Sequence, residues 1–207
     1  MGIEPLGRDR QGRIYQKHQV QWTVAVDPRN SRLYSGSADN SIKVWDTAAT
    51  DSGFSCIATL TGHTDSVCAL AVDPTNNRLY SSTGDQNASG SSSDKSIKVW
   101  DTATTRNMPC IATLVGHTNS VFALAMDPDN GRLFSGSDDR SIKVWDTAAA
   151  DGSFPCIATL TRHTHWVRAL AVDPGNDRLY SSSVDYSIRV WDVPAMVNIT
   201  WTDSRGE

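Results

Sequence analysis

The chain has 207 residues, 39% of them hydrophobic and 20% charged, a composition typical of a folded domain rather than a disordered segment. Its net charge is −4, whereas nucleic-acid-binding domains are usually basic, so the composition argues against nucleic acid as the main partner. No run approaches the ~18 apolar residues of a membrane span, and the N-terminal MGIEPLGRDRQGR lacks the apolar run of a secretory signal. We therefore expect an intracellular protein, in the cytoplasm or the nucleus, with no membrane partner.

One sequence pattern recurs four times along the chain. Tryptophans spaced by about 45 to 55 residues lie in SIKVWDT at 41–47, 96–102 and 141–147, and in SIRVWDV at 187–193. A DP-x-N-x-R-L segment precedes each of them and begins at Asp27, Asp73, Asp127 or Asp173. In the last three copies a GHT or RHT triplet comes earlier still, at 62–64, 116–118 and 162–164. Such self-similarity is the signature of a repeat architecture.

We expect four short strands in each copy, and the second copy illustrates them. The residues 67–72 form a near-continuous apolar run, which is typical of a buried strand. The next five residues, 73–77, predict a turn, because Pro presets φ and the Asp and Asn side chains bond nearby backbone. The segments 78–82, 96–100 and 110–114 supply the other three strands. Nothing shows a sustained helical period, so the fold class is all-β.

A single unit of this kind carries apolar residues on both faces and cannot cover both by itself. Stacking the copies side by side around a centre buries these faces against one another. The repeat therefore predicts an array of β-sheets, but it leaves open how many units close a ring.

Three of the four cysteines occupy one position of the repeat. Cys56, Cys110 and Cys156 each begin the pentapeptide CIATL, and the chain contains no CxxC pair. We expect them to be small apolar residues of a buried strand rather than disulfide partners or metal ligands.

The GH…WD signature, in units of about 45 residues, resembles the WD40 repeat family of β-propellers. The resemblance covers about residues 13–193 and all four copies. It implies antiparallel four-stranded blades, four of them in this chain, with a protein-binding face around a central channel, no intrinsic catalysis and no cofactor. We expect a flexible N-terminal arm, a propeller region and a C-terminal tail: 1–12, 13–203 (blades at about 19–60, 61–114, 115–160 and 161–203) and 204–207.

The resemblance also implies a buried Trp–Ser/Thr–His–Asp network in each blade. An indole N–H donates, a hydroxyl and a neutral imidazole each donate and accept, and a carboxylate accepts, so such a chain satisfies every member. The matching residues are His63, Ser81 or Thr83, Asp94 and Trp100; His117, Ser135 or Ser137, Asp139 and Trp145; and His163, Ser181 or Ser183, Asp185 and Trp191. The first copy keeps Asp39 and Trp45 but has Lys17-His18 in place of Gly-His. Because the set recurs with a Trp, we interpret it as structural rather than as a catalytic triad.

Candidate partner-binding residues are those that differ between copies at one rim. The resemblance places them on the narrower face, near the start of each innermost strand. They are Trp22, Cys68, Phe122 and Arg168, with Trp166 and Asp138 beside them and Arg162 and His165 close by. Aromatic residues and Arg dominate binding hot spots. Two interpretations stay open: a protein or peptide partner with an acidic group facing Arg162 and Arg168, or aromatic rings that fill gaps between blades.

Three roles are compatible with this pattern: an interaction scaffold, a substrate adaptor of a cullin-RING ubiquitin ligase, or a fragment of a larger WD40 regulatory protein. Such adaptors usually carry Arg or Lys three residues after the Asp of WD, and this argues against the second role, since those positions are Ala49, Thr104, Ala149 and Ala195. The Ser/Gly-rich insertion 83–95 is either a tolerated loop or a partner contact.

The sequence leaves three ways in which the ring of blades can close. The chain is part of a longer protein, two chains pair as a homodimer into an eight-bladed ring, or four blades close alone.

Overall fold

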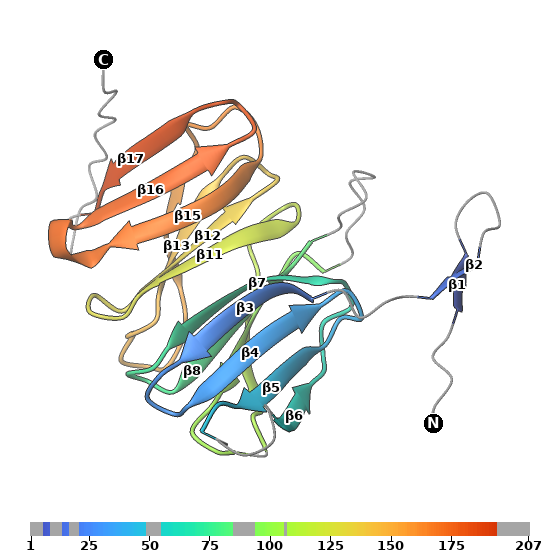
Figure 1. Cartoon of the computed structure of the whole chain (residues 1–207). Helices are drawn as coiled ribbons and strands as arrows, with labels where there is room; N and C mark the ends of the chain where they lie inside the picture. The colour runs from blue at the N-terminus through green and yellow to red at the C-terminus, as the bar shows by residue number, and fades with distance from the viewer. Residues whose placement is uncertain are drawn as a thin grey trace.

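The computed structural model describes residues 6–8, 14–16, 21–48, 55–84, 94–105 and 107–193, and it describes no side chain before residue 23. The described chain is a succession of short β-strands with one 3-10 turn, η1 (Pro174–Asn176) (Figure 1). This confirms the prediction of an all-β repeat fold. In chain order, the strands that form the repeated sheets are β3 (Gln21–Asp27), β4 (Arg32–Ser37), β5 (Ile42–Asp46), β6 (Ser55–Leu60), β7 (Val67–Asp73), β8 (Arg78–Thr83), β9 (Ile97–Asp101), β10 (Cys110–Leu114), β11 (Val121–Asp127), β12 (Arg132–Ser137), β13 (Ile142–Asp146), β14 (Cys156–Leu160), β15 (Val167–Asp173), β16 (Arg178–Ser183) and β17 (Ile188–Asp192).

Consecutive strands pair in antiparallel fashion to form the blades. Three sheets have four strands each, β3–β6, β7–β10 and β11–β14, and the last has the three strands β15–β17. The fourth blade was expected to extend over about 161–203, and its last part, from residue 194, lies outside the described residues. Separately, β1 (Leu6–Arg8) pairs with β2 (Ile14–Gln16) in a two-stranded antiparallel sheet.

The turn between the first two strands of each blade follows from its Asp-Pro sequence. In the first blade, the carboxylate Oδ1 of Asp27 accepts the backbone N–H groups of Arg29 at 3.0 Å and Asn30 at 3.2 Å. In the turns of the second and third blades, four residues after the Asp, Asn77 and Gly131 have φ values of 51° and 60°, in the left-handed region that Asn and Gly tolerate best. The prediction of a turn closed by side-chain bonds is confirmed at these positions.

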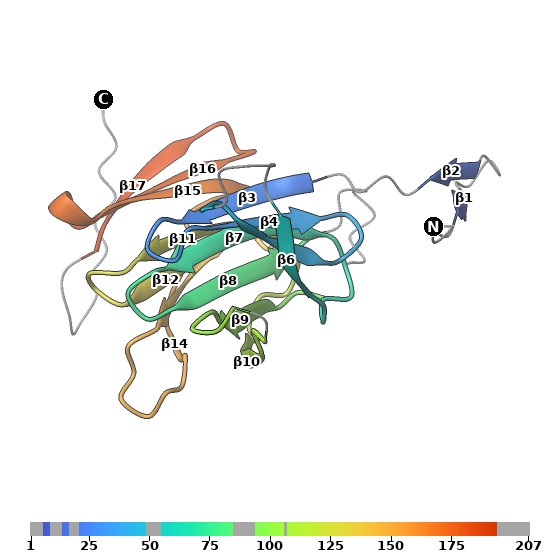
Figure 2. The ribbon, with the colours of Figure 1, turned by 60° about the horizontal axis from the view of Figure 1, so that its bottom comes forward.

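The blades stack through their first strands. β3 packs against β7, β7 against β11 and β11 against β15, so these four strands line the inside of the array. Figures 1 and 2 show the four sheets following one another in this order. Between each pair of blades lies a separate apolar cluster, and these three clusters are the core of the protein.

The prediction that Cys56, Cys110 and Cys156 are buried was wrong. Cys56, Cys110 and Cys156 are exposed, and Cys68 is half-buried. The first three lie at the beginning of β6, β10 and β14, the outermost strands, which have a sheet neighbour on one side only. Each thiol contacts the backbone oxygen two residues further on, at 3.3 to 3.4 Å, instead of entering the core.

Among the described residues, no helix is long and apolar enough to cross a membrane.

Candidate partner-binding site

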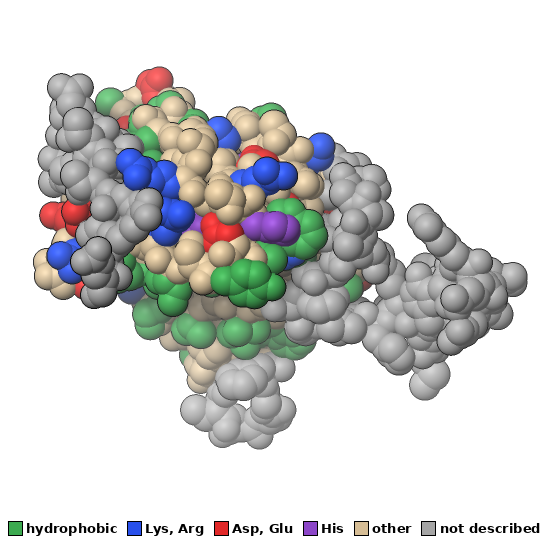
Figure 3. All heavy atoms as spheres, turned by 90° about the horizontal axis from the view of Figure 1, so that it is seen from above, with side chains coloured by type: hydrophobic (Ala, Val, Ile, Leu, Met, Phe, Trp, Pro, Cys, Tyr) green, Lys and Arg blue, Asp and Glu red, His purple; other side chains and the backbone are tan. Residues whose placement is uncertain are grey.

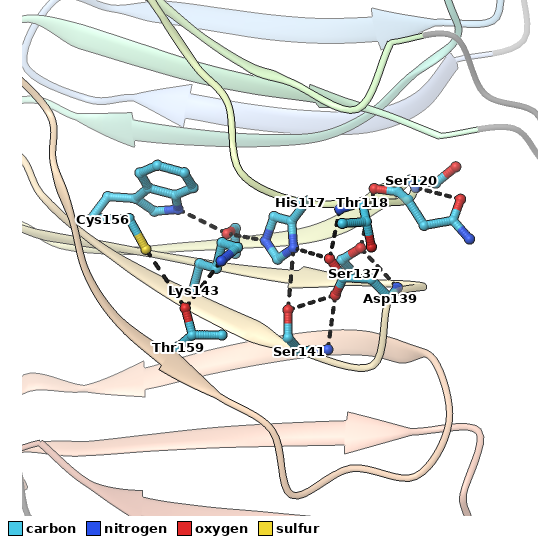
Figure 4. Close-up of polar contacts among 12 residues, drawn as sticks. His117, Thr118, Ser120, Ser137, Asp139, Ser141, Lys143, Cys156 and Thr159 are labelled. Atoms are coloured by element: carbon cyan, nitrogen blue, oxygen red, sulfur yellow. Dashed lines mark hydrogen bonds and ion pairs between the residues drawn. The ribbon is translucent and has the colours of Figure 1, made fainter.

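A continuous hydrogen-bonded chain joins four side chains inside the third blade. Trp145 Nε1 donates to Ser135 Oγ at 2.9 Å, and Ser135 Oγ lies 2.8 Å from His117 Nε2. The other imidazole nitrogen, Nδ1, lies 2.8 Å from Asp139 Oδ2 (Figure 4). Because a carboxylate accepts and an indole donates, the proton of His117 sits on Nδ1 and the hydroxyl of Ser135 donates to Nε2. A neutral imidazole therefore satisfies the whole chain.

The same network recurs in the second and fourth blades. His63 lies 2.7 Å from Ser81 and 2.8 Å from Asp94, and Trp100 donates to Ser81 at 2.8 Å. In the fourth blade the corresponding distances are 2.7, 2.8 and 2.8 Å, among His163, Ser181, Asp185 and Trp191.

The structure also selects among the hydroxyl groups that the sequence left open. Ser81, Ser135 and Ser181 join the networks, whereas the alternative residue two positions later bonds backbone groups. In the third blade, for example, Ser137 Oγ accepts from the N–H of Asp139 and donates to the carbonyl of Asn119.

A fifth member of each network was missed by the sequence analysis. The Ser that begins each SIKVWD or SIRVWD segment donates its hydroxyl to the second oxygen of the network Asp. Ser141 Oγ lies 2.6 Å from Asp139 Oδ1, and Ser96 Oγ lies 2.5 Å from Asp94 Oδ1. The sequence could have indicated this Ser, because an Asp-x-Ser triplet precedes every WD motif.

These bonds set the charge of the network carboxylates. Burial by itself would raise the pKa of Asp139, but the hydrogen bonds from His117 and Ser141 outweigh it and hold that pKa well below the usual value. The pKa of Asp94 is lowered in the same way by His63 and Ser96. The network Asp is therefore an anion at neutral pH.

The first blade has a smaller set of described contacts. Trp45 Nε1 donates to Ser35 Oγ at 2.9 Å, and Ser41 Oγ donates to Asp39 Oδ1 at 2.6 Å. The position of His18 lies outside the described residues. In the other three blades the network Ser is fully or almost fully buried, so it has no access to a substrate. Its geometry suits holding strands together.

A second group of side chains comes together where the innermost strands begin. The guanidinium carbon of Arg168 lies 4.1 Å from the ring centre of Phe122 and 4.7 Å from that of Trp166. Its Nη2 lies 3.6 Å from Asp138 Oδ1. The ring of His165 meets that of Trp166 edge-on, with centres 4.9 Å apart. We call these five residues the Arg168 cluster.

The Arg168 cluster joins three blades. Arg168 and Trp166 belong to the fourth blade, and Phe122 and Asp138 to the third. Phe122 also lies against Gly84 of the second blade, so closely that a Cβ added to Gly84 would lie 2.6 Å from its ring. Gly84 lies at the start of the Ser/Gly-rich insertion 83–95, and its carbonyl oxygen accepts a hydrogen bond from Cys68 Sγ, at 3.3 Å. Cys68 therefore adjoins the cluster through Gly84.

The structure describes two of the predicted partner-binding residues in less detail. Arg162 is exposed in the segment between β14 and β15. Trp22 lies in β3, and its side chain is outside the described part of the structure. The space-filling view from above shows acidic, basic, histidine and hydrophobic side chains side by side at the surface (Figure 3).

Burial and charge act against each other at Asp138. Its side chain is only 9% exposed, and this burial raises the pKa of the carboxyl to about 6. The charges of Arg168 and His165 oppose the increase, and the neighbouring Asp139 adds to it. The side chain of Arg168, by contrast, is 35% exposed. Its guanidinium carbon lies against the rings of Phe122 and Trp166, and solvent still reaches part of the side chain.

No group of three or more His, Cys, Asp or Glu side chains in the described ranges could hold a metal ion.

Comparison with known proteins gives a family match over most of the chain. The family described as "WD domain, G-beta repeat" matches four segments: 10–46, 54–101, 108–146 and 154–192.

Individual relatives match about half of the chain. The nuclear distribution protein PAC1 of Arthroderma benhamiae is 35% identical over 123 residues, which are 58% of this chain and 25% of that protein. The ribosome biogenesis protein WDR12 homolog of Nematostella vectensis is 28% identical over 117 residues, 56% of this chain and 26% of that protein. The chain thus spans about a quarter of the length of these two relatives.

Proposed function

Because the chain belongs to the WD40 repeat family, we propose that it is a non-catalytic scaffold that binds a protein or peptide partner through the Arg168 cluster. The observation that carries this proposal is the guanidinium of Arg168, which lies against the rings of Phe122 and Trp166 at the rim of the array. Aromatic residues and Arg are the side chains most enriched at binding hot spots.

The chemistry of the cluster favours an acidic group on the partner. An Arg that packs against two rings has already lost much of its conformational freedom, so less is lost when a carboxylate binds to it. A hydrogen bond to a charged group contributes about 1.5–3 kcal/mol. The carboxylate of Asp138 contacts Arg168 through Nη2, so the partner's carboxylate would share or replace this contact.

We place this role inside the cell. The relatives support this placement, since one is a nuclear distribution protein and another a ribosome biogenesis protein. Their specific roles concern those proteins, of which this chain covers about a quarter.

Selection from a random displayed peptide library tests the proposal. We expect the peptides retained by the purified chain to be enriched in Asp, Glu or a free C-terminal carboxylate. Their affinity should fall about 10-fold or more for Arg168→Gln, since loss of one charged hydrogen bond costs at least roughly 1.5 kcal/mol. Trp166→Ala should also weaken binding, because it removes one of the two rings that hold the guanidinium.

Arg29→Gln is the matched control. Arg29 is an exposed arginine in the turn that follows β3, at the other end of that innermost strand from the rim, and it bonds the carbonyl of Pro74. Equal binding by the parent chain, Arg168→Gln and Trp166→Ala would overturn the proposal, and so would selection of peptides without acidic groups.

A further inference from the structure

Every junction between blades joins the same two kinds of face. One blade presents the face directed toward the next blade in chain order, which we call its forward face. The next blade presents the opposite face, which we call its rear face. At the first junction, Tyr34, Ile42 and Val44 on the forward face pack against Leu79 and Trp100 on the rear face. The third junction repeats this pattern with Phe134, Ile142 and Val144 against Leu179 and Trp191.

The rear face of the first blade has no described blade to cover it. Val24 and Val26 are 63% and 60% exposed, whereas Leu70, which occupies the position of Val24 in the second blade, is 8% exposed. Leu33 and Trp45 are half-buried, although their equivalents in the other three blades are at most 3% exposed. The side chains are those of an internal junction, but solvent reaches them.

The forward face of the fourth blade is open in the same way. Ile188 is 76% exposed, whereas its equivalents in the first three blades are at most 1% exposed. Tyr180 and Val190 are half-buried, although Tyr34 and Val44 of the first blade are completely buried. Tyr, Ile and Val thus stand on this open face at the positions where the first blade buries the same three residue types.

The two open faces therefore match each other as the two sides of an internal junction do. They lie at opposite ends of the described array, so they cannot meet within one array as it stands. We propose that a second copy of this chain covers them: the forward face of the fourth blade of each copy packs on the rear face of the first blade of the other. Two such junctions related by twofold symmetry close a ring of eight blades and leave no blade face open.

A polar contact at the first two internal junctions supports this pairing. Arg32 Nη1 donates to the carbonyl of Thr102 in the second blade at 2.5 Å, and Arg78 Nη1 donates to that of Thr147 in the third blade at 2.6 Å. Arg178 holds the same position in the fourth blade, and its side chain is 52% exposed. Its acceptor in the ring would be the carbonyl of Thr47 in the second copy.

The mass of the 207-residue chain in dilute solution tests the proposal. Light scattering behind a sizing column should give about 45 kDa, twice the chain mass of 22.5 kDa. Val24→Asp on the rear face or Ile188→Asp on the forward face should each reduce the mass to that of one chain and leave the circular dichroism of the strands unchanged. Both side chains are exposed within one copy, so a folded single chain tolerates the charge. Val115→Asp is the control, because Val115 is 76% exposed in the loop after β10 and lies on neither open face.

Mixing the two dissociated variants tests which faces meet. A ring made from one Val24→Asp copy and one Ile188→Asp copy contains one junction with neither substitution, so the mixture should recover part of the 45 kDa species. A compact parent of 22.5 kDa would overturn the proposal, and so would an open series of larger oligomers. It would also be overturned by a dimer that withstands either substitution, because the dimer would then use other surfaces. None of these measurements involves the Arg168 cluster, so they succeed or fail independently of the proposed partner.

Discussion

Replacing Ser135 with Ala should destabilise the third blade strongly, although the change removes a single oxygen. Ser135 is completely buried, and its hydroxyl accepts the indole N–H of Trp145 and donates to Nε2 of His117. Both partners would lose a bond in a place that water does not reach, since Trp145 is 2% and His117 6% exposed. A buried polar group left without a hydrogen bond costs about 1–3 kcal/mol, so with two such groups we expect a loss of at least about 2 kcal/mol.

The first blade provides the comparison. Ser35 accepts the indole of Trp45 at 2.9 Å, and Trp45 is half-buried, so water can replace part of the lost bond. Ser35→Ala should therefore cost about 1 kcal/mol or less. The free energy of unfolding is obtained from urea titrations of both variants at pH 7, followed by tryptophan fluorescence. For a chain of this size, the larger loss corresponds to a melting temperature lower by at least roughly 4 °C.

The reasoning fails if Ser135→Ala costs no more than Ser35→Ala. A double-mutant cycle gives a second check on the same bond. Ser135→Ala and Trp145→Phe should be coupled by about 0.5–3 kcal/mol, because each removes one side of the same hydrogen bond. Additive losses in the free energy of unfolding would mean that the hydrogen bond between the indole and the hydroxyl contributes nothing to stability.

Three further predictions concern titration and exposure. The lowered pKa of Asp139 contributes stability that is present above about pH 4 and is lost as the pH falls further, so Asp139→Asn should be less stable than the parent at pH 7 and should lose less stability in an acid titration followed by circular dichroism. Asp138 should behave in the opposite way: its raised pKa contributes stability that is complete below about pH 4 and is lost as the pH rises through about 6, so Asp138→Asn should flatten the pH dependence of the melting temperature between these values, and an unchanged profile would contradict this. Cys56, Cys110 and Cys156 are exposed, so a thiol reagent should label these three positions in the native protein; protection of all three from the reagent would show that the outermost strands are covered.

The sequence by itself determined the strands and turns, because both depend on local chemistry. The Asp-Pro turn after β7 recurs in each copy, the apolar run before it recurs in most of its positions, and four copies of one pattern leave little choice of fold. The residues of the buried network were also identifiable, since His, Asp and Trp recur at matching positions of the repeat.

Sequence spacing could not choose between hydroxyl groups on one strand. Ser135 and Ser137 are two residues apart in β12, and alternate residues of a strand point to the same face. Only the position of His117, which comes from a different segment, brings Ser135 into the network. The cysteines show the same limit, because CIATL has the pattern of a buried strand and the place of that strand at the edge of each sheet exposes its first residue.

Only the tertiary structure decided which side chains from different blades meet and which faces remain open. The rings of Phe122 and Trp166 lie on different blades, and stacking of the blades brings both onto the guanidinium of Arg168. Likewise, Ile188 has the sequence surroundings of Ile142, yet one is 76% exposed and the other is completely buried. The physical reason is that a side chain's burial depends on whether another blade packs against its own, and a repeated sequence is the same in either case.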